Sequence, residues 1–204
     1  MTAPREGLRE RQKRRRRERM YHAALELFHE KGFYETTVED IAAKSHVSRG
    51  TFFNYFPYKE AVLLEYGRAL MEDAFEEARR ALEAGADPVE ALYGFWRRLA
   101  ELSEAELGRD LLAPLAHELV NPDPERAEYA YRTLPLASKV KQFLRPLKEA
   151  GRLRQDMSLE RIAASLADAY LLAALRWAAY GAGENLAEET EKFLKVALEG
   201  VLAR

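Results

Sequence analysis

Residues 36 to 59 read TTVEDIAAKSHVSRGTFFNYFPYK, and this stretch decides the fold of the first part of the chain. Thr36 and Glu39 have the S/T-x-x-E spacing of a capping box, which starts a helix by satisfying backbone N–H groups in its first turn. Ser48 is a suitable N-cap for a second helix, which we expect over residues 49–56. The spacing therefore predicts two short helices joined by a tight turn.

The apolar residues of this stretch fall on one face of each predicted helix. Val38, Ile41 and Ala42 recur at helical spacing in the first helix, and Phe52 and Phe56 stand four residues apart in the second. We expect these side chains to point inward together. The polar residues of the second helix then face outward.

The outward residues have the chemistry of DNA readout. Arg49 can pair with guanine O6 and N7, and Asn54 with adenine N6 and N7. Gly50 has no side chain, so the backbone can approach a surface closely. The alternative interpretation is a plain helical hairpin with a polar outer face. The candidate DNA-binding residues of this stretch are Thr37, Ser48, Arg49, Gly50, Thr51, Phe53, Asn54, Tyr55, Tyr58 and Lys59, of which Tyr55, Tyr58 and Lys59 are expected to position phosphates.

Residues 14–64 resemble the DNA-binding domain of the tetracycline-repressor (TetR) family of transcriptional regulators. The matching pieces are AALELFHEKGF at 23–33, TTVEDIAAKSHVSRGTFFNYF at 36–56, and Lys59. The family commonly has tyrosine where this chain has Phe53, so a hydroxyl contact to phosphate is missing, and apolar contact with a thymine methyl is a possible substitute. The resemblance implies a dimeric, ligand-responsive repressor that binds a palindromic operator in double-stranded DNA.

Composition supports a helical protein. The 204 residues are 48% hydrophobic and 32% charged, and the abundance of Ala, Leu, Glu and Arg favours an all-α fold. There is no cysteine, which excludes disulfides and thiolate chemistry. Residues 1–60 carry a charge of +4 and the remainder −6, so the first part attracts a polyanion. No signal peptide or membrane-spanning stretch is expected, which makes the cytoplasm the expected location.

A dense basic run leads into the first predicted helix. We expect this helix to end at Lys31. Residues 1–10 are expected to be disordered. The arginines of the run, with Arg14 and Arg15 as candidates, can reach the minor groove or the phosphates as an arm. The alternative is a solvated, frayed first turn.

About nine helices are predicted in two domains. Residues 11–56 form a three-helix DNA-binding domain, and residues 57–204 form a larger ligand-binding and dimerisation domain. In the second domain Pro57, Asp87-Pro88, Pro124 and Asn185 mark helix starts. Pro135 and Pro146 are expected to kink or split a helix over 124–150. Further helices are expected over residues 57–82, 88–106, 108–120 and 159–180, and from 185 to the C-terminus, with Gly181 and Gly183 ending the helix before it.

The middle helices are rich in aromatic residues, and their prolines can open a cavity. An ordinary aromatic core is the alternative for any single residue. The family resemblance implies an inducer pocket, and apolar helices near basic residues suit a fatty acyl-coenzyme A. A neutral aromatic compound, as in regulators of drug efflux, is the alternative effector. The candidate ligand-binding residues are Tyr93, Trp96, Arg109, Leu112, Lys139, Phe143, Arg145, Tyr170 and Trp177.

The last two helices are predicted to form a homodimer interface. One short recognition helix reads too few bases for useful specificity, which by itself favours a dimer. The family resemblance implies that these helices pair with their copies as a four-helix bundle. The alternative is that their apolar residues only fill the domain's own core. The candidate interface residues are Ile162, Leu166, Ala173, Phe193, Ala197 and Val201.

Enzymatic function finds no support in the sequence. The four histidines make no H-x-x-x-H pair, and no phosphate-binding loop, nucleophile elbow or dinucleotide fingerprint is present. No metal site, cofactor or catalytic residue is predicted. An enzyme on a helical bundle, and a ligand-binding protein without DNA function, are the two rivals to a transcriptional regulator.

Overall fold

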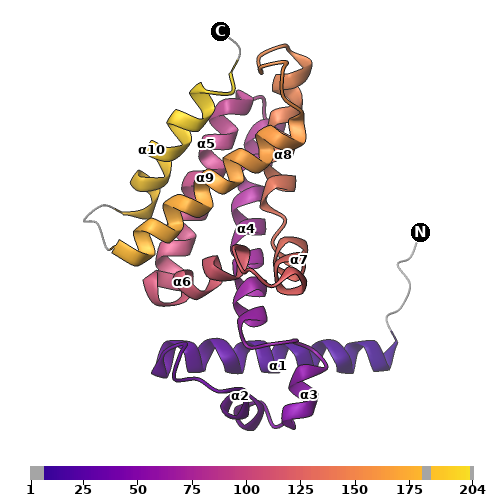
Figure 1. Ribbon diagram of the computed structural model, residues 1–204. Helices are drawn as coiled ribbons and strands as arrows, with labels where there is room; N and C mark the ends of the chain where they lie inside the picture. Colours follow the sequence, from indigo (N-terminus) through magenta and orange to yellow (C-terminus); the bar gives the residue numbers. More distant parts are fainter. Residues whose placement is uncertain (1–6, 181–184, 203–204) are drawn as a thin grey trace. The chain divides into compact units, whose positions relative to one another are not determined.

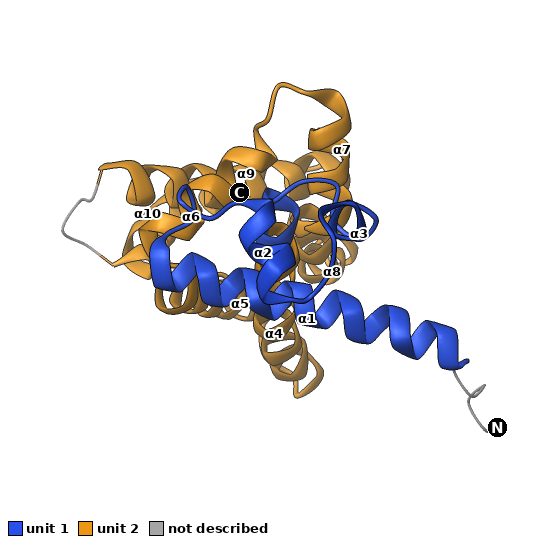
Figure 2. Ribbon diagram, turned by 90° about the horizontal axis from the view of Figure 1, so that it is seen from below, with its two compact units in different colours: residues 1–63 blue, residues 64–204 orange. Residues whose placement is uncertain are grey.

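The computed structural model describes residues 7–180 and 185–202, and within these ranges the regular structure is helical apart from one isolated bridge between Leu153 and Leu202 (Figure 1). The all-α prediction is confirmed. Contacts divide the chain into unit 1, residues 1–63, and unit 2, residues 64–204 (Figure 2), whereas the sequence placed the boundary between residues 56 and 57. The helices are α1 Leu8–Lys31, α2 Val38–Lys44, α3 Arg49–Phe53, α4 Glu60–Glu83, α5 Pro88–Leu102, α6 Gly108–Leu119, α7 Pro124–Thr133, α8 Leu136–Glu149, α9 Leu159–Tyr180 and α10 Leu186–Glu199, with a π-helical segment at Ser103–Leu107.

The core of unit 1 is built from the apolar faces of α1, α2 and α3. Met20 and Phe28 of α1, Ile41 of α2, and Phe52 and Phe56 are at most 2% exposed. The two phenylalanines at 52 and 56 lie 5.5 Å apart between ring centroids, which confirms that they point inward together. Because they occupy the inner face, the polar residues of α3 are left on the surface.

The capping box of α2 lies one residue later than predicted. Thr37, not Thr36, is the N-cap: its hydroxyl accepts from the backbone N–H of Asp40 at 3.1 Å, and the Asp40 carboxylate accepts from the backbone N–H of Thr37 at 2.8 Å. Thr36 is buried and donates to the carbonyl of Gly32 at 2.8 Å. The predicted capping box of Thr36 with Glu39 is wrong, because the Thr36 hydroxyl bonds to the turn after α1 instead.

The recognition helix is shorter than predicted. α3 ends at Phe53, so Asn54 and Tyr55 belong to the turn that follows. The next helix begins at Glu60 and not at Pro57, since the backbone N–H groups of Ala61 and Val62 bond three residues back in a tighter turn. At the other end of unit 1, α1 already begins at Leu8, which corrects the expected disorder there; residues 1–6 lie outside the described ranges.

The expected helix over 88–106 changes its winding near its end. Asp87 caps α5 through the backbone N–H of Val89 at 2.9 Å, with Pro88 at the first position, as predicted. From Ser103 the chain continues as a π-helix to Leu107, and α6 starts at Gly108, whose φ of 56° suits glycine. The change places the side chains of Ser103 and Leu107 inside unit 2.

Prolines act unequally in unit 2. Pro135 separates α7 from α8, as predicted, but Pro114 and Pro146 lie inside α6 and α8 without ending them. An interior proline costs about 3 kcal/mol. The apolar faces of α6 and α8 are buried on both sides of each proline, and this packing offsets the lost backbone bond.

α9 is the central helix of unit 2, packed against α6, α8 and α10 (Figure 1). Ser158 caps it through the N–H of Arg161, and Asn185 caps α10 through the N–H of Glu188. α10 ends at Glu199, before the expected end, and Gly181 and Gly183 lie outside the described residues. By length and composition α9 could cross a membrane, which corrects the expectation that no stretch could, but its apolar face is buried in this unit.

Candidate DNA-binding surface and ligand cavity

The exposed face of α3 and the turn that follows it carry the predicted base-reading residues. Arg49, Gly50, Phe53 and Asn54 are exposed, and Thr51 is half-buried. The Ser48 hydroxyl accepts from the backbone N–H of Thr51 at 3.1 Å and lies 2.9 Å from the Thr51 hydroxyl. Ser48 and Thr51, two of the predicted DNA-contacting residues, therefore also stabilise the first turn of α3.

Arg49 is held at the surface by its neighbours. Its Nε lies 2.8 Å from a carboxylate oxygen of Glu39, and its guanidinium lies 5.4 Å from the centroid of the Phe53 ring. An exposed ion pair of this kind contributes at most about 1 kcal/mol, so a guanine edge can displace Glu39. Phe53 supports the guanidinium from α3, which gives this residue a function that needs no hydroxyl.

Lys59 points into unit 1. Its ammonium donates to the backbone carbonyls of Phe33 at 2.7 Å and Thr36 at 2.9 Å, and lies 4.0 Å from the centroid of the Phe33 ring. Burial lowers the pKa of Lys59, while Glu60 and Glu35 act in the opposite direction. The lysine thus ties the turn after α1 to the start of α4. Its predicted phosphate contact stays a prediction and requires exchange of these bonds.

The remaining predicted DNA contacts lie elsewhere on unit 1. Tyr55 and Tyr58 are half-buried in the turn after α3. Arg14 and Arg15 are exposed on α1, where Arg14 lies 3.6 Å from Glu18. Thr37 is exposed, but its hydroxyl serves the cap of α2 by donating to Asp40 at 2.6 Å.

Unit 2 contains a small apolar cavity of about 30 Å³. Its polar group is a pair of hydroxyls: Ser103 and Tyr170 lie 3.2 Å apart between oxygens. Burial raises the pKa of Tyr170, so this phenol is neutral at physiological pH. The lining residues are Gly67, Met71, Leu99, Ser103, Leu107, Leu112, Leu115, Ala116, Leu119, Leu134, Leu136, Tyr170, Leu171 and Ala174.

An open groove of about 450 Å³ adjoins the cavity. It lies along α9 and the α7–α8 connection, and Tyr131, Pro135, Ala164 and Asp168 are among its lining residues. Four leucines line both the groove and the cavity, so they form the partition between the two spaces. These are Leu119, Leu134, Leu136 and Leu171.

Two of the nine predicted ligand-binding residues, Leu112 and Tyr170, line the cavity. Trp96 stands directly behind Tyr170, with the rings stacked at 4.9 Å, and its Nε1 has no hydrogen-bond partner in the described part of the chain. Phe143 packs on Phe95 at 5.6 Å and belongs to the aromatic core. The cavity walls that the sequence missed are mostly leucines and alanines, which give no signal beyond ordinary helix periodicity.

The predicted basic mouth is not assembled at the cavity. Lys139 pairs with Glu72 at 2.6 Å and lies over the Phe75 ring, while Arg109 lies over Trp177 at 4.9 Å. Tyr93 is half-buried, and burial together with Glu191 raises its pKa. Arg145 is exposed, and neither it nor the residues above lines the cavity or the adjoining groove. The sequence placed these residues on the helices of unit 2, but the structure does not bring them together around one cavity.

Most residues of the predicted dimer face lie inside unit 2, and the interface itself stays a prediction. Ile162, Leu166 and Ala173 are fully buried within unit 2, and Val201 is 7% exposed, so they offer no surface to a second copy. Periodicity identified the apolar face of each helix, and the chain uses that face for its own core. Phe193 and Ala197 are half-buried. The large apolar side chains exposed on α9 and α10 are Leu172, Tyr180 and Val196.

A short recognition helix with an exposed arginine, an exposed asparagine directly after it, and a helical unit with an apolar cavity define a helix-turn-helix transcriptional regulator. A family model described as bacterial regulatory proteins of the tetR family matches residues 21–66. A second, described as the C-terminal domain of TetR/AcrR family transcriptional repressors, matches residues 68–200. The chain belongs to the TetR/AcrR family of transcriptional repressors.

Three relatives show how far the likeness extends. The crystal structure of Thermus thermophilus FadR, a TetR-family repressor in complex with lauroyl-CoA, is 56% identical and covers 92% of this chain and 96% of that one, with a TM-score of 0.85. The repressor DhaR of Mycobacterium sp. is 25% identical over 91% of this chain and 92% of its own length. TcmR of Streptomyces glaucescens is 40% identical over 102 residues, and the match spans 50% of this chain and 45% of TcmR.

Proposed function

We propose that this chain is a cytoplasmic, homodimeric repressor, without enzymatic activity, that binds a palindromic operator and leaves it when a fatty acyl-CoA binds unit 2. The observation that carries the proposal is the apolar cavity with its adjoining groove, in a chain 56% identical to a repressor whose crystal structure contains lauroyl-CoA. An apolar lining favours an alkyl chain over a charged metabolite.

The cavity alone is too small for such a ligand. About 30 Å³ corresponds to about one water molecule, whereas small-molecule sites measure about 300–1,000 Å³. The partition of four leucines separates this cavity from a groove of about 450 Å³. Displacement of those side chains would join the two spaces. An acyl chain can provide the free energy for this, since each buried methylene contributes about 0.8 kcal/mol.

α4 is the element through which binding can reach the DNA-binding unit. Gly67 and Met71 of this helix line the cavity, and the same helix begins at Glu60 within unit 1. A ligand that widens the cavity therefore acts on a helix that both units share. By reciprocity, a ligand that weakens operator binding by a given factor must itself bind more weakly to the operator-bound dimer by that factor.

The dimer places its interface on the outer faces of α9 and α10. Leu172 is 51% exposed and Val196 is 74% exposed, so neither side chain lies on the buried face of its helix. Arg176 lies between them in sequence and contacts the ring of Phe193 at 5.8 Å. Large exposed apolar side chains on two packed helices are suited to a second copy of the same helices.

Titration of a DNA–protein complex with acyl-CoA species of increasing length tests the effector. The probe is a duplex from upstream of the protein's own gene, with free coenzyme A as the control. Potency should rise about tenfold for each two methylenes until the space is full. Ala116→Leu, which narrows the cavity, should shift the optimum to shorter chains; Ala113→Leu, on the same helix but outside the cavity lining, should not.

The rival functions give different results in the same experiment. Release by neutral aromatic compounds and by no acyl-CoA would identify a regulator of the drug-efflux type. Binding of acyl-CoA by a protein that retains no affinity for the duplex would identify a ligand-binding protein without DNA function.

A further inference from the structure

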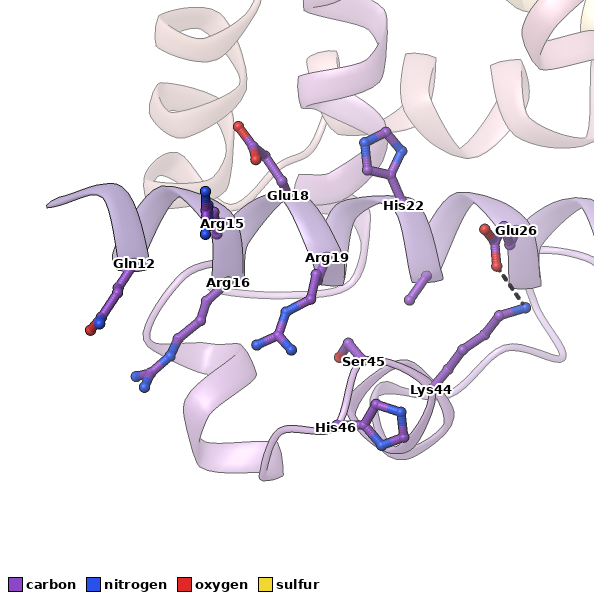
Figure 3. Close-up of a pocket in the computed structure, with 11 residues that line it drawn as sticks. Gln12, Arg15, Arg16, Glu18, Arg19, His22, Glu26, Lys44, Ser45 and His46 are labelled. Carbon is purple, nitrogen blue, oxygen red and sulfur yellow. Dashed lines mark ion pairs between the residues drawn. The ribbon is translucent and has the colours of Figure 1, made fainter. Parts of the chain in front are cut away.

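A cationic groove runs along unit 1 between α1 and the turn that joins α2 to α3. It is an open groove of about 740 Å³. Figure 3 shows Arg16 and Arg19 extending from α1 on the side where the turn with Ser45 and His46 lies, with the Arg19 side chain ending nearer to that turn than the Arg16 side chain. The lining residues are Gln12, Arg15, Arg16, Glu18, Arg19, His22, Ala23, Glu26, Lys44, Ser45 and His46.

The positive charge of this groove is only partly compensated. Lys44 lies 3.0 Å from Glu26 and 3.1 Å from Glu30, which neutralises it within the protein. Arg15, Arg16 and Arg19 have no ion-pair partner among the residues that the structure describes. Arginines that need no partner for folding are available to an anion from outside, and their planar forks suit phosphate oxygens.

His46 has a backbone conformation that normally selects glycine. Its φ of 55° is the one positive value among the described non-glycine residues, and it sits in the turn between α2 and α3. A side chain in this region is strained, so glycine would fit better there. The imidazole is exposed and faces the same groove as Arg16 and Arg19. The strained backbone of His46 therefore places a third polar side chain in the groove, in addition to those of Arg16 and Arg19.

We propose that Arg16, Arg19 and His46 bind a backbone phosphate of duplex DNA at a position separate from the base contacts of α3. The proposal rests on the DNA-binding function proposed above. His46 lies three residues before Arg49, so a duplex read by α3 brings its backbone to the adjacent turn. Backbone phosphates carry no sequence information, and the groove therefore contributes affinity and register, not specificity.

The salt dependence of DNA binding provides the first test. Each phosphate contact contributes about 0.9 to the slope of log K against log salt, so losing one contact per half-site should lower a dimer's slope by about 1.8. Arg16→Gln with Arg19→Gln should show that change and weaken binding about tenfold or more, on the gene's own upstream duplex and on a random duplex alike. Arg97→Gln, an exposed arginine of unit 2, is the control for net charge and should change neither.

Substitutions of His46 test whether its imidazole contributes to DNA binding. His46→Gly should raise the melting temperature, since the strain is removed, and yet weaken DNA binding. His46→Asn, which tolerates the same backbone, should weaken binding without that gain in stability. A higher melting temperature with unchanged affinity and salt slope would overturn the role of His46.

The outcomes distinguish this inference from the proposed function. If wild-type protein binds neither duplex, the DNA-binding function itself is wrong. If wild-type protein binds and the double arginine variant keeps its affinity and salt slope, the groove is not a phosphate site, and the base contacts of α3 stand unaffected.

Discussion

Replacing Lys59 with Met tests whether this lysine supports unit 1 or contacts the DNA backbone. In the structure its ammonium donates to the carbonyls of Phe33 and Thr36 at 2.7 and 2.9 Å, and lies 4.0 Å from the Phe33 ring centroid. Methionine retains the apolar stem and its length but has no donor. The substitution therefore removes the polar contacts while largely keeping the packing.

The expected cost follows from these contacts. Hydrogen bonds from a charged donor contribute about 1.5–3 kcal/mol each, and the contact with the ring adds about 0.5–1 kcal/mol. Burial of the ammonium opposes these gains by a few kcal/mol, consistent with the lowered pKa of Lys59. We expect Lys59→Met to lower the free energy of unfolding of unit 1 by about 2 kcal/mol, with the last turn of α1 losing amide protection first.

Urea unfolding followed by hydrogen exchange of the unit 1 amides measures this change. Lys44→Met is the matched control: Lys44 pairs with Glu26 and Glu30 on the surface, so its loss should lower the free energy of unfolding less than Lys59→Met does. At a temperature where both variants are folded, the salt slope of DNA binding should match that of wild type. Unchanged stability with a slope lowered by about 1 per half-site would refute the reasoning and make Lys59 a phosphate contact.

Three further predictions concern assembly and folding. Leu172→Asp should convert the dimer to monomers in light scattering and weaken operator binding; a variant that stays dimeric would move the interface away from α9. Asp40→Asn should destabilise unit 1 at pH 7, because the hydrogen bond from Lys31 holds the pKa of Asp40 well below its usual range. In urea melts the difference from wild type should begin to shrink as the pH falls below about 4 and be lost only as the pH falls through the lowered pKa of the folded state; a constant difference would contradict this. Glu118→Ala should cost about 3 kcal/mol of stability, because Glu118 is buried and accepts from Arg126 at 2.7 and 3.0 Å; a loss under 1 kcal/mol would show that α7 is held by other contacts.

The sequence determined the features that depend on neighbours along the chain. Apolar spacing, with Ser48, Asp87 and Asn185 as helix caps, was sufficient to predict an all-helical chain, and the order of apolar, turn and polar residues in 36–56 was sufficient to predict the helix-turn-helix. These signals are local, since a cap acts within three residues and a helical face repeats within four. For the same reason the sequence resolved helix ends less well, as the choice between Thr36 and Thr37 shows.

Only the tertiary structure decided where side chains point when their partners are distant in the sequence. Lys59 bonds to carbonyls 26 and 23 residues away, and Ser103 meets Tyr170 across 67 residues. Periodicity shows which face of α9 is apolar. It does not show whether an apolar residue packs in the chain's own core or against a partner, because both environments favour apolar side chains. Burial separates them: Ile162 is inside, and Leu172 is outside. The cavity likewise arises where leucines of several helices fail to fill the space between them, a property of packing that no single stretch encodes.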